Sequence, residues 1–420
     1  MSKKPIVAGG GEGAFEPSII AHGTIGDAAV HQIELSGAGR PFKGADGDGR
    51  SISPRPIIGR WHKERRDLSE SFALPTYRST CRHRRAAGDL ETADRFRVRT
   101  HTMRCPCCGA RDFRLSERCS TEATSAYREC GHCGILIDLR ALASGVVETF
   151  LRERLVEGRF VCQKGDPIIV ESYALRTLAL SRSLAHSPLG ETQRDALCRP
   201  YRSLPAIAEL FPLARIEPLP VSLVILCRPV DLQDLAPRLP ALERSFDDIV
   251  LMLDATIAPE TPPLGGNVRL IARPLEGDFA AQRNGGQAAM TCGWGLQLDA
   301  DESLDESTMD DLGRVCALAE TAGALSIGLL RRNLVDGVLA DLHPDVQYRL
   351  NHRSVRFEGK VHERPALPRG WRDGFIAPNL AIDHHLTRAH VETRSARYDA
   401  LLPGKGRVFE RDALLTPYRP

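Results

Sequence analysis

From residue 219 onward, short apolar runs alternate with segments whose apolar residues recur at helical spacing. Uninterrupted apolar runs of this kind are typical of strands that are buried on both faces of a parallel sheet. The expected strands are residues 221–226, 248–253, 268–271, 294–298 and 324–330. Residues 232–246, residues 279–290 and a segment starting near 303–307 are expected to be helices. This alternation predicts an α/β fold with a mostly parallel sheet and covering helices.

Acidic residues follow two of these expected strands. Asp254 closes the second strand, and Asp299 and Asp301 close the fourth. The carboxyl ends of parallel strands form the edge at which open α/β sheets bind ligands. Because Mg²⁺ and Mn²⁺ prefer oxygen ligands, Asp299 and Asp301 are predicted to hold such a cation and, through it, a diphosphate. The alternative is that they form a solvated acidic turn before the next helix.

A basic and an amide side chain stand next to each other in the helix expected over residues 279–290. These are Arg283 and Asn284. The planar guanidinium group binds phosphate oxygens in pairs, so Arg283 suits a diphosphate. The alternative is an ordinary surface arginine. For Asp254 the alternative is a turn former at the end of a strand.

Four sequence blocks, in this order, resemble a family 2 glycosyltransferase with the nucleotide-diphospho-sugar transferase (GT-A) fold, close to lipopolysaccharide-core glucosyltransferases. They are the strand ending at Asp254, residues 281–284, residues 298–302, and residues 331–337 with their continuation through 345–350 and 357–363. The resemblance covers roughly the last half of the chain. It implies that Asp254 contacts the nucleoside, that Arg283 meets the diphosphate or ribose, and that Asn284 belongs to the residues that bind the nucleotide sugar. It also implies that Asp299 and Asp301 hold the metal and the sugar nucleotide.

The resemblance further implies an inverting transfer of a hexose from a nucleotide-diphosphate donor to an acceptor hydroxyl. Such a reaction needs one carboxylate base, for which Glu363 and Asp345 are the candidates and Glu363 is slightly preferred. His384 is a candidate third ligand of Mn²⁺ or Mg²⁺, since a late histidine completes the metal shell in some GT-A enzymes, and its alternative is a polar loop residue. The acceptor is expected to be a carbohydrate or a lipid-linked molecule, in glycan or cell-envelope polysaccharide synthesis.

A non-catalytic role is the competing hypothesis. The first strand is followed by Cys227, Arg228 and Pro229, whereas the family usually has small polar and acidic residues there. A degenerate transferase domain of this kind would serve as a binding scaffold.

A second constellation lies upstream, where two C-x-x-C pairs stand about 20 residues apart, close to the spacing of a zinc ribbon. The pairs are Cys105 with Cys108 and Cys130 with Cys133, and a glycine follows each pair. Four thiolates form a closed tetrahedral site, so the expected role of Zn²⁺ is structural. His132 lies inside the second pair and is not expected to be a ligand. A reduced cysteine-rich loop without metal is the alternative.

The composition of the chain bears on its expected partners and cellular compartment. The net charge is +2, which gives no electrostatic case for a nucleic-acid partner. The 12 cysteines lack a disulfide-like pattern outside the two pairs, so a reducing cytoplasm is expected. No apolar stretch of about 18 residues is present, so any membrane contact is expected to be peripheral, at the inner face.

These patterns divide the chain into four predicted parts. Residues 1–100 are rich in glycine and arginine and are expected to be flexible. Residues 101–140 are the expected zinc ribbon and residues 141–217 a helical connector. Residues 218–420 are the expected catalytic domain.

Overall fold

A computed structural model describes residues 103–116, 127–198, 204–259, 265–360, 362–401 and 408–419. All of them belong to one of the two units into which the chain divides, residues 83–420. The predicted flexible region, residues 1–100, lies outside the described residues.

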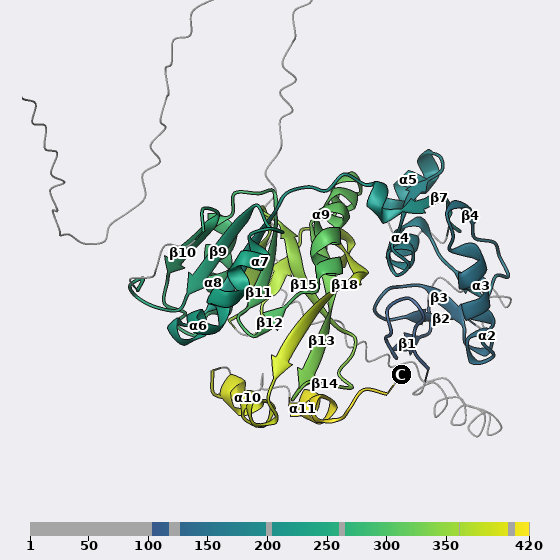
Figure 1. Cartoon of the computed structure of the whole chain (residues 1–420). Coiled ribbons are helices and arrows are strands. Elements are labelled where there is room, and N and C mark those ends of the chain that lie inside the picture. The colour runs from purple at the N-terminus through teal and green to yellow at the C-terminus, as the bar shows by residue number, and fades with distance from the viewer. Residues whose placement is uncertain are drawn as a thin grey trace, which may run out of the picture. The chain divides into compact units, whose positions relative to one another are not determined.

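The largest sheet contains the parallel strands that the apolar runs predict. In space, β10, β9, β8 and β11 are neighbours in that order, and each adjacent pair is parallel (Figure 1). Their bounds are Val221–Cys227 for β8, Asp248–Leu253 for β9, Val268–Ala272 for β10 and Trp294–Asp299 for β11. All four expected strands of this half are therefore confirmed to within about two residues.

The other half of the same sheet mixes strand directions. The order continues from β11 through β15, β13 and β18 to β12, with β14 paired to β13. β15 runs antiparallel to both β11 and β13, whereas β13 and β18 are parallel. The bounds are Glu302–Ser303 for β12, Ser326–Val335 for β13, Val338–Leu339 for β14, Asp345–His352 for β15 and Gly374–Leu386 for β18. The sheet is thus mixed, and its parallel part carries the acidic strand ends.

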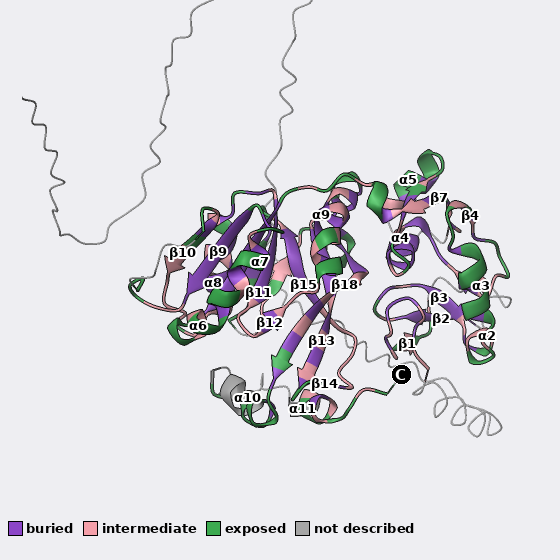
Figure 2. Cartoon of the chain, in the orientation of Figure 1, coloured by how far each residue is buried: buried purple, intermediate pink, exposed green. Residues whose placement is uncertain are grey.

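Helices cover both faces of the parallel strands, which explains why these strands lack polar alternation. Leu223 and Ile225 of β8 pack into a cluster with Leu312 of α9 (Glu306–Thr321). Val224 faces the opposite way, into a cluster that includes Ala289 of α8 (Phe279–Ala289). Figure 2 shows these central strands as buried. Side chains on both faces of β8 are therefore removed from water.

The helix expected over residues 232–246 is broken into short pieces. These are α6 (Leu232–Leu235), η4 (Ala236–Arg238) and α7 (Leu239–Leu242). Pro237 and Pro240 lie within this stretch and supply no backbone N–H, so a continuous α-helical hydrogen-bond pattern cannot form.

The cysteine-rich segment forms a four-stranded antiparallel sheet of its own. The strands are β1 (Phe113–Arg114), β2 (Tyr127–Cys130), β3 (Leu136–Asp138) and β5 (Ile168–Ile169). This is the ribbon-like arrangement that the cysteine spacing predicts.

The segment expected to be a helical connector, residues 141–217, contains strands as well as helices. Its helices are α3 (Val146–Arg154), α4 (Ser172–Leu180) and α5 (Glu191–Cys198), with α2 (Leu139–Ala143) just before and η2 (Leu213–Arg215) near its end. Its strands β4 (Gly158–Val161), β6 (Leu184–Pro188) and β7 (Ile207–Pro212) form an antiparallel sheet. Ile168, Leu175 and Leu210 share one core with the four cysteines, so the connector and the ribbon pack as one body.

Short elements complete the described chain. They are η3 (Pro229–Asp231), β16 (Arg356–Glu358), β17 (Arg364–Ala366), η5 (Gly370–Asp373), α10 (Arg388–Leu401) and α11 (Val408–Leu415). None of the helices in the described ranges combines the length and the apolar character needed to cross a membrane.

Candidate functional site

The acidic residues predicted from the sequence gather around the end of β8. Asp299 lies opposite Leu226 of β8, and the backbone N–H of Asp254 donates to the carbonyl of Cys227 at 2.8 Å. Asp254 and Asp299 thus flank the same strand end, with β8 between them, about 10 Å apart across two strand spacings.

Arg228 stands at this edge between the two acidic strand ends. Its guanidinium pairs with Asp231 at 2.7 Å and is 61% exposed. The hydrogen bond with Asp231 is the main cause that raises the pKa of Arg228, and the charges of Asp301 and Asp254 raise it further. Both aspartates are therefore close enough to act on one exposed cation, and the strand ends form a common charged surface.

Arg283 of α8 lies beneath this surface and is almost completely buried. Its side chain is 1% exposed, and it donates to Oδ1 of Asp299 at 2.7 Å and to Oε1 of Glu363 at 2.5 Å. Burial alone would lower the pKa of Arg283, but the charges of Asp299 and Glu363 raise it above its ordinary value. Arg283 is therefore a permanent cation that joins two acidic groups from distant parts of the chain.

Asn284, next to Arg283 on α8, is hydrogen-bonded to the backbone of β16 (Arg356–Glu358). Its amide nitrogen donates to the carbonyl of Phe357 at 2.9 Å, and its amide oxygen accepts from the N–H of Phe357 at 2.8 Å. Both ends of the amide are engaged with the backbone of β16. These two hydrogen bonds hold α8 against β16.

Arg349 of β15 is a site residue that the sequence reasoning missed. Its guanidinium is 9% exposed and donates to Oδ2 of Asp299 at 3.1 Å. Each carboxylate oxygen of Asp299 therefore accepts from one buried arginine. The signal was present in the sequence, because Gln347, Arg349 and Asn351 alternate with other residues and place polar groups on one face of the strand.

Asp301 faces His384, the histidine predicted to complete a metal site. The Nε2 atom of His384 lies 3.5 Å from Oδ2 of Asp301, and its Nδ1 lies 2.8 Å from the amide oxygen of Asn333. Burial raises the pKa of Asp301, but the hydrogen bond and charge of His384 outweigh burial and bring it below its ordinary value. Because Mg²⁺–oxygen bonds are about 2.1 Å long, two atoms 3.5 Å apart can contact one such cation. His385 points elsewhere and bonds the hydroxyl of Ser303 at 2.8 Å.

Asp299 is less available than Asp301 for a metal. Burial and the nearby Asp301 raise the pKa of Asp299, while Arg283 opposes them. Both of its oxygens already accept from arginine. The two aspartates predicted to share one metal therefore have different surroundings. Asp301 is 40% exposed and faces His384. Asp299 is held by Arg283 and Arg349.

Glu302 lies behind this acidic tip and is fully buried. One of its oxygens accepts from the N–H of Asp299 at 2.9 Å, and the other from Arg331 at 3.3 Å. Burial and Asp299 raise the pKa of Glu302 to about 8, although Arg331 works against this rise. Glu302 thus fixes the turn that carries Asp299 and Asp301.

The two candidate bases differ in their surroundings. Asp345 accepts from Arg331 at 2.9 and 2.6 Å, from Asn333 at 3.1 Å and from Gln347 at 2.6 Å. Burial would raise the pKa of Asp345, but Arg331 and these hydrogen bonds lower it to about 2. Glu363, with a side chain 10% exposed, contacts Arg283 through Oε1. Asp345 is thus the more completely engaged of the two.

The four cysteines predicted to bind zinc come together in the ribbon. Cys105, Cys108, Cys130 and Cys133 are all buried, and their sulfur atoms lie within 4.8 Å of one another. Tetrahedral Zn–S bonds of about 2.3 Å place sulfur atoms about 3.8 Å apart. The Cys105–Cys133 and Cys108–Cys130 sulfur distances are both 3.6 Å, so the donor set fits zinc.

The backbone around the cysteines repeats the same turn twice. The N–H of Gly109 donates to the carbonyl of Cys105, and the N–H of Gly134 donates to that of Cys130, at 2.8 and 3.0 Å. Both glycines have φ of +77°, a left-handed conformation that favours glycine. His132 is exposed and outside the cluster. Within the described ranges, these cysteines are the one group of three or more metal-binding side chains gathered so closely.

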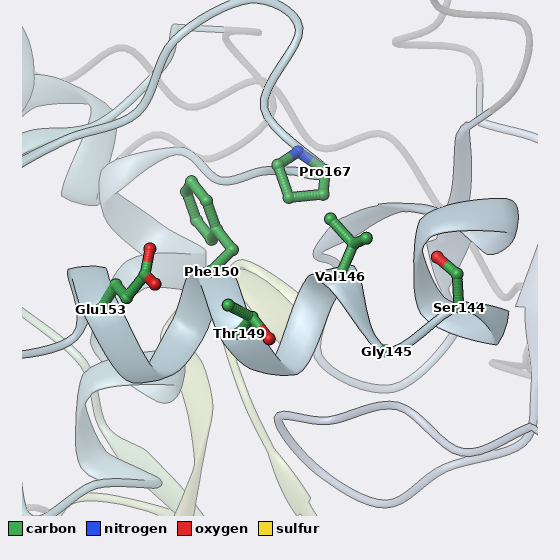
Figure 3. A pocket seen from close by; sticks show the side chains of 7 residues that line it. All are labelled: Ser144, Gly145, Val146, Thr149, Phe150, Glu153 and Pro167. Carbon is green, nitrogen blue, oxygen red and sulfur yellow. The ribbon is translucent and has the colours of Figure 1, made fainter.

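A groove lies away from both centres, on α3. It has a volume of about 330 Å³ and is lined by Val146, Phe150 and Pro167 together with Ser144, Gly145, Thr149 and Glu153. Figure 3 shows Val146 and Phe150 on α3 on the side toward Pro167. Its lining contains none of the strand-end residues, so we do not assign the sugar nucleotide to it.

Known proteins show only weak similarity to this chain. Neither a family model nor a curated protein matches the chain. Among solved structures, S. aureus TarS is similar, with a TM-score of 0.28, 11% identity, and coverage of 47% of this chain and 42% of that chain. Residues 1–349 of TarS in complex with UDP give a TM-score of 0.27, 10% identity, and coverage of 47% and 70%. The chain thus spans less than half of full TarS, and at these TM-scores function has to be argued from the chain's own residues.

Proposed function

We propose that residues 218–420 form a glycosyltransferase that moves a sugar from a nucleotide-diphosphate donor to an acceptor hydroxyl. The observation that carries this proposal is the Asp301–His384 pair at the carboxyl edge of the parallel strands, beside Asp254 and Arg228. An acidic edge of this kind, with a carboxylate and an imidazole facing each other, suits a divalent cation and a diphosphate.

Each group at the edge has a role in this proposal. Asp254 binds the nucleoside, and the exposed Arg228 binds the diphosphate as the guanidinium that shares the edge with Asp254 and Asp301. Asp301 and His384 are the residues that would hold Mn²⁺ or Mg²⁺, which would supply positive charge for the leaving diphosphate. Arg283 and Arg349 hold both carboxylate oxygens of Asp299. In this proposal Asp299 therefore contributes less to metal binding than Asp301.

The chemistry assigned to the site is a single displacement. The acceptor oxygen attacks the anomeric carbon, the bond from that carbon to the phosphate oxygen breaks, and the nucleoside diphosphate leaves with the bonding electrons. Glu363 takes the acceptor's proton through Oε2, since Oε1 is bonded to Arg283. One displacement inverts the anomeric centre. Asp345 is the less suitable base because Arg331, Asn333 and Gln347 already occupy its oxygens.

The wider setting follows from the same proposal. The acceptor is a carbohydrate or a lipid-linked molecule, as in cell-envelope polysaccharide synthesis, and contact with a membrane would be peripheral. We place the reaction in the cytoplasm, where thiols stay reduced and available to bind zinc.

Ligand-dependent thermal stability tests the proposal. UDP and GDP, each with Mn²⁺, should raise the melting temperature of the full chain, because a ligand that binds only the folded state stabilises it. The Asp301→Ala variant should lose this shift and should also lose Mn²⁺-dependent release of UDP or GDP from a nucleotide sugar. Asp310→Asn, an exposed acid of α9, is the matched control and should keep both. Absence of any shift with either nucleotide would favour the non-catalytic scaffold.

A further inference from the structure

An arginine just before the first cysteine links the zinc ribbon to the catalytic half of the chain. Arg104, which directly precedes Cys105, is 12% exposed and donates to Asp341 at 3.1 Å and to the carbonyl of His343 at 2.9 Å. It also donates to the carbonyl of Gly109, inside the first cysteine turn, at 3.2 Å. One guanidinium therefore bridges the metal-binding turn and the loop at residues 340–344.

Neighbouring groups enclose this bridge. Arg111 pairs with Asp341 at 3.1 Å, and the guanidinium of Arg104 lies 4.2 Å from the ring centre of Tyr418. A Cβ atom built on Gly109 would lie 3.8 Å from Pro344, so the first cysteine turn packs directly on the loop. The last described residues also lie beside β1 (Figure 1), and the carbonyl of Arg419 accepts from both arginines.

The same loop is hydrogen-bonded to the candidate metal site. The amide nitrogen of Asn333 donates to the carbonyl of Leu342 at 3.2 Å and to Asp345 at 3.1 Å. The amide oxygen of Asn333 lies 2.8 Å from Nδ1 of His384, whose Nε2 faces Asp301. Asn333 is fully buried, so its orientation depends on these partners. A continuous set of contacts thus runs from the cysteine turn to the imidazole at the strand edge.

We propose that the zinc-bound ribbon positions the active site, with Arg104 as the positioning residue and Asn333 as the relay to His384. Zinc bound by the four cysteines would fix the first cysteine turn, and the Gly109 carbonyl of that turn and Asp341 together hold Arg104 against the loop. The loop then holds Asn333, which orients the ring of His384 and selects the nitrogen presented to Asp301. A hydrogen-bond partner behind a metal-binding histidine typically changes metal affinity by about 10-fold to 100-fold when it is removed. The part of this inference that concerns nucleotide binding rests on the proposed function.

Hydrogen exchange tests the coupling without any nucleotide. The full chain should be compared with and without Zn²⁺, after removal of the metal by a chelator under reducing conditions. Removal should speed amide exchange at residues 340–345 and 384–385 by at least about 10-fold, while exchange in β9 stays the same, because opening of an ordered segment controls these rates. Exchange that changes in the ribbon and leaves residues 340–345 untouched would overturn the inference, whatever the enzyme does.

Substitution of Arg104 separates positioning from metal loss. Arg104→Ala should keep the zinc content of the unaltered chain and yet weaken binding of Mn²⁺ with UDP or GDP by about 10-fold. Arg104→Lys should restore part of the affinity, and Arg140→Ala, at an exposed arginine of α2, should change nothing.

Two outcomes keep this inference apart from the proposed function. If neither nucleotide binds the unaltered chain while hydrogen exchange still responds to zinc, the transferase proposal fails and the coupling stands. If Arg104→Ala retains zinc and binds Mn²⁺ with nucleotide as tightly as the unaltered chain, the coupling is refuted and the transferase proposal is untouched.

Discussion

Arg283 and Glu363 are 80 positions apart in the chain, and the structure joins them through a 2.5 Å ion pair. The same guanidinium bonds Asp299 at 2.7 Å. A single buried cation therefore ties the end of β11 to the residue that we assign as the catalytic base.

Replacing Arg283 tests this tie. Arg283→Met would leave the largely buried Glu363 without its cation and Asp299 with Arg349 alone, and removing one partner of a buried pair costs about 3–5 kcal/mol. The measurement is the free energy of unfolding in urea. Arg244→Met, at an exposed arginine, is the matched control and should change stability by less than about 0.5 kcal/mol. An Arg283→Met protein as stable as the unaltered chain would contradict the proposed pairing.

The two candidate bases can be told apart by kinetics and stability together. Glu363→Gln should lower kcat by about 10²-fold to 10⁴-fold, the usual contribution of a general base, and should leave nucleotide binding intact. Asp345→Asn should act mainly on stability, because Arg331 would lose its closest partner. A larger fall of kcat in a well-folded Asp345→Asn protein would transfer the role of base to Asp345.

Adjacent glycines of α8 offer a matched pair of substitutions. A Cβ on Gly286 would lie 2.3 Å from Cγ1 of Val224 in β8, too close without a shift of the helix. On Gly285 the nearest atom is the flexible end of Met252, at 3.1 Å. Gly286→Ala should therefore destabilise by about 1–3 kcal/mol through overpacking. Gly285→Ala should be nearly neutral, because the helix preference of alanine over glycine, about 1 kcal/mol, offsets the close contact with Met252. Thermal unfolding of the two variants checks the order.

Stability should fall in mild acid because of a buried histidine. Burial, with the charge of Arg176, lowers the pKa of His186 to about 3 in the folded state. The unfolded value is about 6.5, so the unfolded chain takes up a proton first as the pH falls. The contribution of neutral His186 is complete above about pH 6.5 and is lost as the pH falls toward about 3, by about 2 kcal/mol between pH 7 and pH 5.

Urea unfolding at several pH values measures this loss. His186→Leu should flatten the dependence, whereas His132→Gln, at the exposed ribbon histidine, should preserve it. An unchanged slope in His186→Leu would assign the acid sensitivity to other groups.

Zinc content distinguishes the ligands from a neighbouring thiol. The purified chain should carry about one Zn²⁺, and Cys130→Ser should lose it because a structural site needs all four ligands. Cys107 is also buried but lies outside the four-sulfur cluster, so Cys107→Ser should keep the metal. Elemental analysis after gel filtration gives the ratio. Loss of zinc in both variants would require a different ligand set.

Much of the fold could be predicted because its signals are local. The strand Asp248–Leu253 and the helix Phe279–Ala289 match the expected ranges within about a residue, since continuous apolar runs and helical spacing are properties of short segments. The cysteine cluster was predictable for a similar reason, because the turn geometry of a C-x-x-C pair with a following glycine is set within a few residues.

The failures have equally specific causes. Residues 232–246 have helical spacing, yet two prolines divide them into short turns. The connector contains a sheet because β7 (Ile207–Pro212) pairs with β4 and β6. The pattern of residues within each short strand does not predict this pairing.

At the candidate site, the sequence by itself determined which residue types are present and which strands they end: Asp254, Asp299 and Asp301 follow directly from the pattern of buried strands. Only the tertiary structure decided how these groups are shared. In the folded chain, Asp299 pairs with Arg283 and Arg349. Asp301 faces His384, and Asn284 bonds the backbone of β16. The physical reason is the distance along the chain over which each interaction is decided. A strand or a turn is chosen by neighbours in the chain, whereas the partner of a buried charge is chosen by whichever opposite charge the packing brings within about 3 Å, and that depends on the whole sheet.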